Sequence, residues 1–223
     1  MSDNFANTFE ETIKSKTARE LIVQGADITF SKIAESGLLN EIPIFGLMNG
    51  AVKLIHDFRN FRFAEKIYRF LFQTQDIPIH KQVEFIYDYG QVNKENGYEL
   101  LLSVIDRLDN LNKIDIMTNF VRNRVYKKIT INEFIRLTIA LERIPYPDIQ
   151  NLPNYLTDCY EPGVTDMLNA SGLLFESIID ANETNKYQLN TTGRDFLKYG
   201  LNKDIEDRDN APVQMPGQMW HNQ

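Results

Sequence analysis

The most suggestive chemical feature of the sequence is a run of four basic residues, Arg59, Arg62, Lys66 and Arg69. Their spacings of 3, 4 and 3 residues confine them to an arc of about 80° on one helix face, and we call them the basic stripe. Directly before them lies the apolar segment Ile42–Val52. An apolar segment with a basic flank is typical of a helix that docks onto an anionic membrane surface, where each Lys or Arg contributes about 1 kcal/mol.

The same residues also fit the interior of a folded protein. As a helix, Ile42–Val52 rises only about 16 Å, which is too short to span the roughly 30 Å core of a bilayer. Gly46 and Gly50 allow close helix packing. Aromatic residues surround the stripe, so its arginines are expected to pair with carboxylates such as Asp106 and Asp109. The sequence therefore favours burial of these residues in the protein core. The alternatives are contact with a membrane surface or with another anionic partner.

The sequence contains no recognisable catalytic signature, such as a phosphate-binding glycine loop, a serine elbow or a zinc-binding His-Glu-x-x-His helix. The three histidines, His56, His80 and His221, are far apart in the chain, which argues against a three-histidine metal site. Cys159 is the single cysteine and is interpreted as a small buried hydrophobe rather than a nucleophile. We therefore predict no catalytic residue, no metal site and no cofactor.

Two aspartates near residue 107 form a candidate carboxylate pair. Asp106 and Asp109 are three residues apart, which predicts that they share one helix face. Carboxylates at this spacing bind metals in bundles that also supply a Glu-x-x-His motif, but the histidine is missing here. An Asp–Arg network that ties this helix to a neighbour is therefore favoured over a metal site.

Composition and charge narrow the class of protein. The chain has 223 residues, of which 43% are hydrophobic and 25% charged, typical of a folded soluble protein. A single cysteine indicates a reducing compartment, and we expect the cytoplasm. The net charge of −7 is uneven, because residues 1–139 hold 18 basic and 18 acidic residues, whereas residues 140–223 hold 6 and 13. This acidic second part disfavours binding to nucleic acid.

Hydrophobic spacing predicts a mainly all-α protein, an irregular helical bundle over residues 8–144. One amphipathic helix is expected from Phe9 to Ser36, ended by Gly37, and Pro43 is expected in the first turn of another. The Thr130-x-x-Glu133 pattern predicts a helix start. Pro145-Tyr146-Pro147 interrupts helical spacing and marks the predicted boundary to a module over residues 145–201, followed by a flexible polar tail over 202–223.

The predicted module, with helices, a β-hairpin and a final helix, resembles a winged-helix domain. The resemblance is carried by Leu168–Leu174 (LNASGLL), where the second helix would end, and by Tyr187–Leu197 (YQLNTTGRDFL), where the last helix would begin. Winged helices usually bind DNA. Here the expected recognition segment, residues 161–171, contains Glu161 and Asp166 and no Lys or Arg, which disfavours contact with phosphates.

The layout of the whole chain resembles uncharacterised bacterial proteins and, more distantly, the abortive-infection alpha family and phage superinfection-exclusion proteins. It differs from the exclusion proteins in having no transmembrane hairpin. The resemblance implies a non-enzymatic binding protein of bacteria with a role in phage defence. We expect a protein partner, with peripheral contact to the anionic inner membrane as an alternative. Two rival functions stay open, a winged-helix transcription regulator and an enzyme with an unrecognised carboxylate site; oligomeric state is not predicted.

Overall fold

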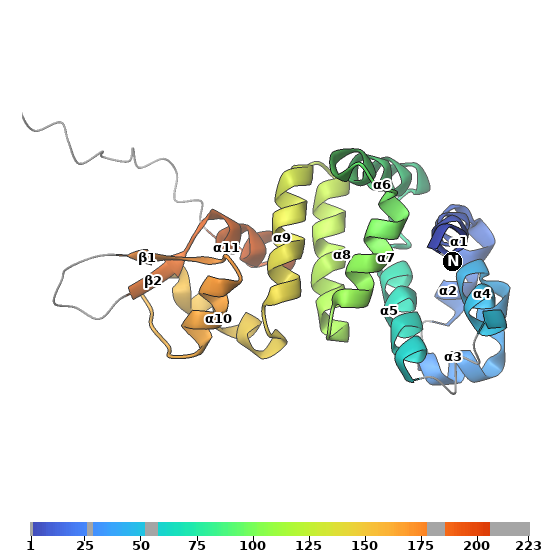
Figure 1. The fold of residues 1–223 in the computed structure, drawn as a ribbon, viewed down its shortest axis with the longest axis horizontal. Helices are drawn as coiled ribbons and strands as arrows, with labels where there is room; N and C mark the ends of the chain where they lie inside the picture. The colour runs from blue at the N-terminus through green and yellow to red at the C-terminus, as the bar shows by residue number, and fades with distance from the viewer. Residues whose placement is uncertain (1, 26–28, 52–57, 178–185, 206–223) are drawn as a thin grey trace, which may run out of the picture.

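The computed structural model describes residues 2–25, 29–51, 58–177 and 186–205, and in these ranges the protein is mainly α-helical with one antiparallel β-hairpin (Figure 1). This confirms the fold class predicted from the sequence. No helix within these ranges is long and apolar enough to cross a bilayer. In chain order the elements are α1 (Ser2–Lys14), α2 (Lys16–Gln24), α3 (Phe30–Ser36), the 3-10 turn η1 (Leu38–Glu41), α4 (Pro43–Ala51), α5 (Phe58–Thr74), α6 (Ile79–Asn93), α7 (Gly97–Arg107), α8 (Leu111–Val125), α9 (Ile131–Arg143), the 3-10 segment η2 (Tyr146–Leu156), α10 (Val164–Ala170), β1 (Leu174–Ser177), β2 (Lys186–Leu189), α11 (Thr191–Asp195) and the π-turn η3 (Phe196–Gly200).

The N-terminal part contains three helices, α1, α2 and α3, where the sequence predicts one. Ser15 has an extended backbone, and its hydroxyl accepts a hydrogen bond from the backbone N–H of Ala18 at 3.1 Å, which caps α2 and separates it from α1. Gly37, at a φ of 79°, ends α3 as the sequence predicts. Because α1, α2 and α3 all bury apolar side chains, the hydrophobic pattern continues across the breaks and does not reveal them.

The described part of the apolar segment Ile42–Val52 lies in the protein core. Ile44 and Phe45 are completely buried, and the backbone N–H of Ile44 donates to the buried hydroxyl of Thr12 on α1 at 3.1 Å. Pro43 is the first residue of α4. A backbone N–H at this position has no partner within the helix, so proline, which lacks the N–H, costs no hydrogen bond here. This described part of the segment is therefore packed inside the protein, as the favoured interpretation of the sequence predicts.

Helices α5, α7, α8 and α9 stand side by side, and α6 lies across one end of them (Figure 1). Aromatic rings join α6 to α9, with the ring centroid of Phe134 at 5.0 Å from that of Phe85 and 5.5 Å from that of Tyr89. The start of α7 approaches the α6 backbone so closely that a Cβ atom on Gly97 would lie 2.0 Å from the carbonyl oxygen of Ile86. Only glycine permits this contact.

Helix α9 begins and ends where the sequence predicts. Thr130 accepts a hydrogen bond from the backbone N–H of Glu133 at 3.2 Å, and the Glu133 carboxylate accepts one from the Thr130 N–H at 2.6 Å, which completes a capping box. At the other end, Ile144 is extended and Pro145 follows it. A proline ring clashes with a preceding residue in helical conformation, so Ile144 adopts extended angles and α9 ends here.

The C-terminal part contains the β-hairpin. β1 pairs antiparallel with β2, with Leu174 opposite Leu189 and both side chains buried. Cys159 forms an additional antiparallel bridge with Tyr187 through backbone hydrogen bonds of 3.1 and 3.0 Å. The order η2, α10, hairpin and α11 is the order that the sequence predicts for residues 145–201.

The end of the described chain packs against α8. The rings of Phe120 and Phe196 meet edge to face with centroids 5.3 Å apart, and the Asn119 side chain donates to the carbonyl oxygen of Gly200 at 2.8 Å. The buried side chains on both sides of Pro145 belong to one continuous hydrophobic core. Most of the predicted tail, residues 206–223, lies outside the described residues.

Replacing Phe45 by alanine tests the core position of the apolar segment. Because Phe45 is completely buried, we expect the free energy of unfolding to fall by about 3–5 kcal/mol, measured by urea denaturation. The control is Phe58→Ala, which removes a ring that is 80% exposed and should change the stability by less than about 0.5 kcal/mol. Equal effects of the two substitutions would contradict the core position.

Tyr98 provides a test of stability against pH. Burial, with a smaller contribution from the charge of Glu10, raises the pKa of Tyr98 from 10.0 to about 12. Between these two values the folded chain keeps a proton that the unfolded chain has lost, so stability falls as pH rises through this interval. We expect Tyr98→Phe to reduce this alkaline loss by about 2 kcal/mol, measured by denaturant unfolding. Tyr87→Phe, at an exposed ring, should leave the loss unchanged.

Candidate functional site

The basic stripe lies on α5, and its four members occupy different environments. Arg59 is exposed and lies 3.7 Å from the Asp106 carboxylate, whereas Arg62 is half-buried and pairs with Glu65 on its own helix at 3.0 Å. Lys66 is buried, and its ammonium group donates to the backbone carbonyl of Asp106 at the end of α7, at 2.7 Å. The removal of Lys66 from water lowers the pKa of its ammonium group.

Arg69, the last member of the stripe, holds α5 against α8. Its guanidinium donates two hydrogen bonds to the two carboxylate oxygens of Asp115, one of them from Nε at 2.5 Å. The amide of Gln73 donates to the same carboxylate, and the hydroxyl of Thr118 lies within hydrogen-bond distance of the Gln73 side-chain oxygen. This forked arrangement is the strong geometry for an arginine and a carboxylate. Lys66 and Arg69 therefore serve the packing of α5 on α7 and α8.

The carboxylate pair does not share a helix face, so this interpretation of the sequence is wrong. Helix α7 ends at Arg107, and Leu108 has extended backbone angles. Asp109 therefore lies beyond the helix, where it pairs with the buried ammonium of Lys113 at 2.7 Å, while Asp106 faces the stripe. Arg107 forms a double hydrogen bond with Glu142 on α9, at 2.8 and 2.9 Å. Of the Asp–Arg pairs expected from the sequence, Asp106 meets Arg59 of α5, whereas Asp109 pairs with a lysine.

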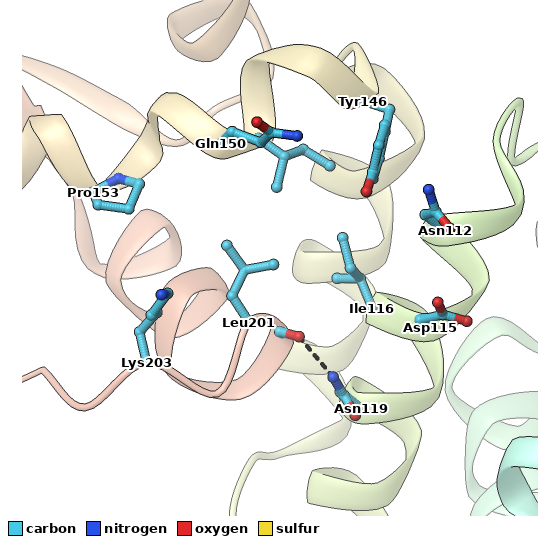
Figure 2. Close-up of a pocket in the computed structure, with 11 residues that line it drawn as sticks. Asn112, Asp115, Ile116, Asn119, Tyr146, Gln150, Pro153, Leu201 and Lys203 are labelled. Carbon is cyan, nitrogen blue, oxygen red and sulfur yellow. Dashed lines mark hydrogen bonds between the residues drawn. The ribbon is translucent and has the colours of Figure 1, made fainter.

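A cleft of about 550 Å³ lies between α8, η2 and the chain that follows η3 (Figure 2). We call it the amide cleft, because side-chain amides from two elements line it. Its size is within the range of sites that bind small molecules or single side chains of a partner. Its walls are Asn112, Asp115, Ile116 and Asn119 from α8, Tyr146, Ile149, Gln150 and Pro153 from η2, and Gly200, Leu201 and Lys203 from the C-terminal turn.

The amide cleft has an apolar middle and polar edges. Figure 2 shows Ile116 and Leu201 extending toward the middle from opposite walls, with Lys203 at one edge and Asn112 at the other. The Gln150 side chain is exposed at the upper wall. An arrangement of this kind buries an apolar group in the middle and offers hydrogen bonds around it.

The polar groups of the amide cleft differ in their availability. The Asn119 amide already donates a hydrogen bond to the Gly200 carbonyl, and this hydrogen bond closes the base of the cleft (Figure 2). Asp115 already accepts hydrogen bonds from Arg69 and Gln73, so its charge is compensated within the protein. The side chain of Gln150 forms no hydrogen bond with any other described residue, which leaves its donors and acceptor for a ligand.

The residues weighed from the sequence for catalysis lie elsewhere. Cys159 is half-buried at the bridge to β2, and burial raises the pKa of its thiol, which opposes formation of the nucleophilic thiolate. His80 is exposed on α6, and His56 and His221 lie outside the described residues. Within the described ranges no group of three His, Cys, Asp or Glu side chains is arranged to hold a metal ion.

Sequence reasoning did not identify the amide cleft, because its walls come from three segments that are distant in the chain. The weak signal was the pair Asn112 and Asn119, whose seven-residue spacing places two amides on one helix face. Nothing in the sequence shows that this face meets η2. No family model, curated protein or solved structure matches this chain.

A double-mutant cycle measures the contact between α5 and α8. Arg69 and Asp115 are each about one-third exposed, so we expect a coupling of about 1 kcal/mol between Arg69→Ala and Asp115→Ala in the free energy of unfolding. The same cycle for Arg62 and Glu65, a single i,i+3 contact within α5, should give about 0.3 kcal/mol. A coupling at Arg69 no larger than that at Arg62 would mean that the fork does not hold the helices together.

Proposed function

We propose that this chain is a non-enzymatic binding protein of bacteria that holds a segment of a partner protein in the amide cleft. The observation that carries the proposal is the exposed amide of Gln150 above an apolar middle formed by Ile116 and Leu201. A side-chain amide both donates and accepts hydrogen bonds, as a peptide backbone requires. The apolar middle can bury one side chain of the partner, which supplies affinity.

The chemistry of the amide cleft supports binding rather than catalysis. Its one carboxylate among the described lining residues, Asp115, is held by Arg69 and Gln73, so it is poorly placed to accept a proton from a substrate. A cysteine or histidine is absent from the described lining. Amides and a tyrosine recognise shape and hydrogen bonds, which are the needs of a binding site. The enzyme alternative therefore has less support.

The charge of the C-terminal part favours a protein partner over DNA. Helix α10 carries the exposed acidic residue Asp166 and contains neither Lys nor Arg. A helix that enters a DNA groove must lie beside phosphates, which an acidic helix repels. Among the described lining residues of the amide cleft, Lys203 is the one cation. A transcription regulator would need a basic face beside the hairpin.

The membrane alternative depends on the exposed end of the basic stripe. Lys66 is buried against a backbone carbonyl and Arg69 is forked onto Asp115, so two of the four cations are engaged within the fold. Arg59 and Arg62 remain at the surface, each beside a carboxylate. A headgroup would have to compete with these internal partners, and the protein partner is therefore favoured.

We place this binding role in the defence of bacteria against phage. The support for a defence role is the resemblance of the chain's layout to the abortive-infection alpha family and to superinfection-exclusion proteins. In this role the chain would act in the cytoplasm by holding a protein that infection supplies or alters. The biological test is therefore survival of bacteria that express the chain when they are challenged with phage.

The binding test begins with random peptides displayed on yeast and selected on the full chain. The double substitution Asn112→Ala with Gln150→Ala removes two amides of the cleft, and we expect it to weaken the selected peptides at least about tenfold in fluorescence polarisation. The same pair of changes at exposed amides elsewhere, Asn7→Ala with Gln24→Ala, is the matched control and should leave the affinity unchanged.

Two results would overturn the proposal. One is the absence of any selected peptide, and the other is a set of peptides whose affinity is insensitive to Asn112→Ala with Gln150→Ala. The phage challenge uses the same two double variants. Loss of protection in the cleft variant, with protection kept in the control variant, is the result expected if the cleft acts in defence.

A further inference from the structure

A second cleft, of about 280 Å³, lies at the opposite part of the bundle, between α1, α6 and the start of α7. This small volume suits the end of an alkyl chain with one polar head rather than a larger ligand. It shares no lining residue with the amide cleft. Its lining is Glu10 from α1, Val83, Ile86, Tyr87, Gly90 and Gln91 from α6, Glu95 and Asn96 from the connection, and Gly97 and Tyr98 from α7.

Tyr98 is the unusual member of this lining. Its side chain is 9% exposed, and its hydroxyl is buried without any hydrogen-bond partner. Its ring packs edge to face against Phe9, with centroids 6.4 Å apart. A buried polar group without a partner destabilises a fold, so its presence needs an explanation. An explanation is a ligand that supplies the missing partner.

Two carboxylates share the second cleft with this hydroxyl. Glu10 pairs with Lys14, one turn further along α1, through one of its two oxygens. Glu95 forms no side-chain hydrogen bond or ion pair with the described residues. The described lining contains no basic side chain, so the uncompensated charge of Glu95 attracts a cation into the cleft.

Two glycines allow close backbone contacts around the second cleft. A Cβ atom on Gly90 would lie 2.7 Å from the carbonyl oxygen of Glu95, and one on Gly97 would lie 2.0 Å from that of Ile86. Asn96 caps α7 by accepting hydrogen bonds from the backbone N–H groups of Tyr98 and Glu99, at 2.9 and 3.3 Å. The cap occupies the donors that would otherwise favour an anion at this helix start.

We propose that the second cleft binds a primary ammonium group, with Tyr98 and the carboxylates of Glu10 and Glu95 as its acceptors. An ammonium carries three N–H donors on a compact head, which matches three acceptors in a small space. The exposed ring of Tyr87 covers the attached alkyl chain. The Tyr98 hydroxyl is itself buried, so the ammonium group must reach it through the cleft that Tyr98 lines.

A primary ammonium group can come from two sources, a free alkylamine and the lysine side chain of another protein. n-Butylamine represents the first, and N-acetyl-lysine methylamide represents the second. Binding of n-butylamine alone would assign the site to a small amine, and binding of both would extend it to lysine. Tetramethylammonium has the same charge without N–H donors, and we expect it to bind at least about tenfold more weakly than the better of the two probes.

Calorimetric titration of the full chain with the better probe tests the named residues. Tyr98→Phe removes only the unpartnered hydroxyl, so it should weaken binding at least about fivefold while the thermal midpoint stays the same or rises. Glu95→Gln should weaken binding at least about tenfold. The matched control is Glu35→Gln, the same change of charge at an exposed residue of α3, which should alter the affinity less than about twofold.

Each remaining outcome contradicts the proposal. Failure of both probes to bind at millimolar concentration excludes an ammonium site. Equal losses in Glu95→Gln and Glu35→Gln would mean that cations only gather around an acidic protein. Unchanged affinity in Tyr98→Phe, or a thermal midpoint lowered by that substitution, would show that the hydroxyl has a structural role instead. The amide cleft shares none of these residues, so its own test is independent of these results.

Discussion

The arrangement of the protein depends on the polar side chains that α8 presents to both of its neighbours. On one side, Asp115 accepts the guanidinium fork of Arg69 and fixes α5. On another, Asn119 and Asn123 donate to the carbonyl oxygens of Gly200 and Tyr199, at 2.8 and 3.1 Å. Carbonyls at the end of a helical turn lack partners within the turn, so these amides supply them. The same two hydrogen bonds place the C-terminal turn where it forms one wall of the amide cleft.

The elements that could be predicted from the sequence are those whose ends are set by local chemistry. The capping box of Thr130 and Glu133 and the left-handed Gly37 are properties of a few neighbouring residues, and the structure confirms both. The break at Ser15 was missed, because the apolar face of α1 and α2 continues across it. Asp106 and Asp109 were misplaced for a related reason, since the helix ends between them while the apolar spacing continues.

The basic stripe shows why a charge pattern alone predicts a surface poorly. The spacing of its members places them on one face of α5, and that prediction concerns only the helix itself. Whether the face meets solvent, lipid or acidic groups depends on Asp106 and Asp115, about forty residues further along the chain. Lys66 and Arg69 meet those partners inside the fold, whereas Arg59 and Arg62 stay near the surface. Long-range pairing of this kind has no local signature in the sequence. The amide cleft could not be predicted for the same reason, because its walls come from segments that are distant in the chain.

The two clefts differ in the kind of ligand that their lining selects. In the amide cleft the one carboxylate of the described lining is compensated by Arg69, so selection rests on shape and on hydrogen bonds with amides such as Gln150. In the second cleft the charge of Glu95 has no compensating partner in the described chain, and a hydroxyl beneath the lining is unsatisfied. An uncompensated charge attracts its ligand over a distance, whereas amides act only on contact. The two proposals are therefore compatible with each other, because the two linings have no residue in common.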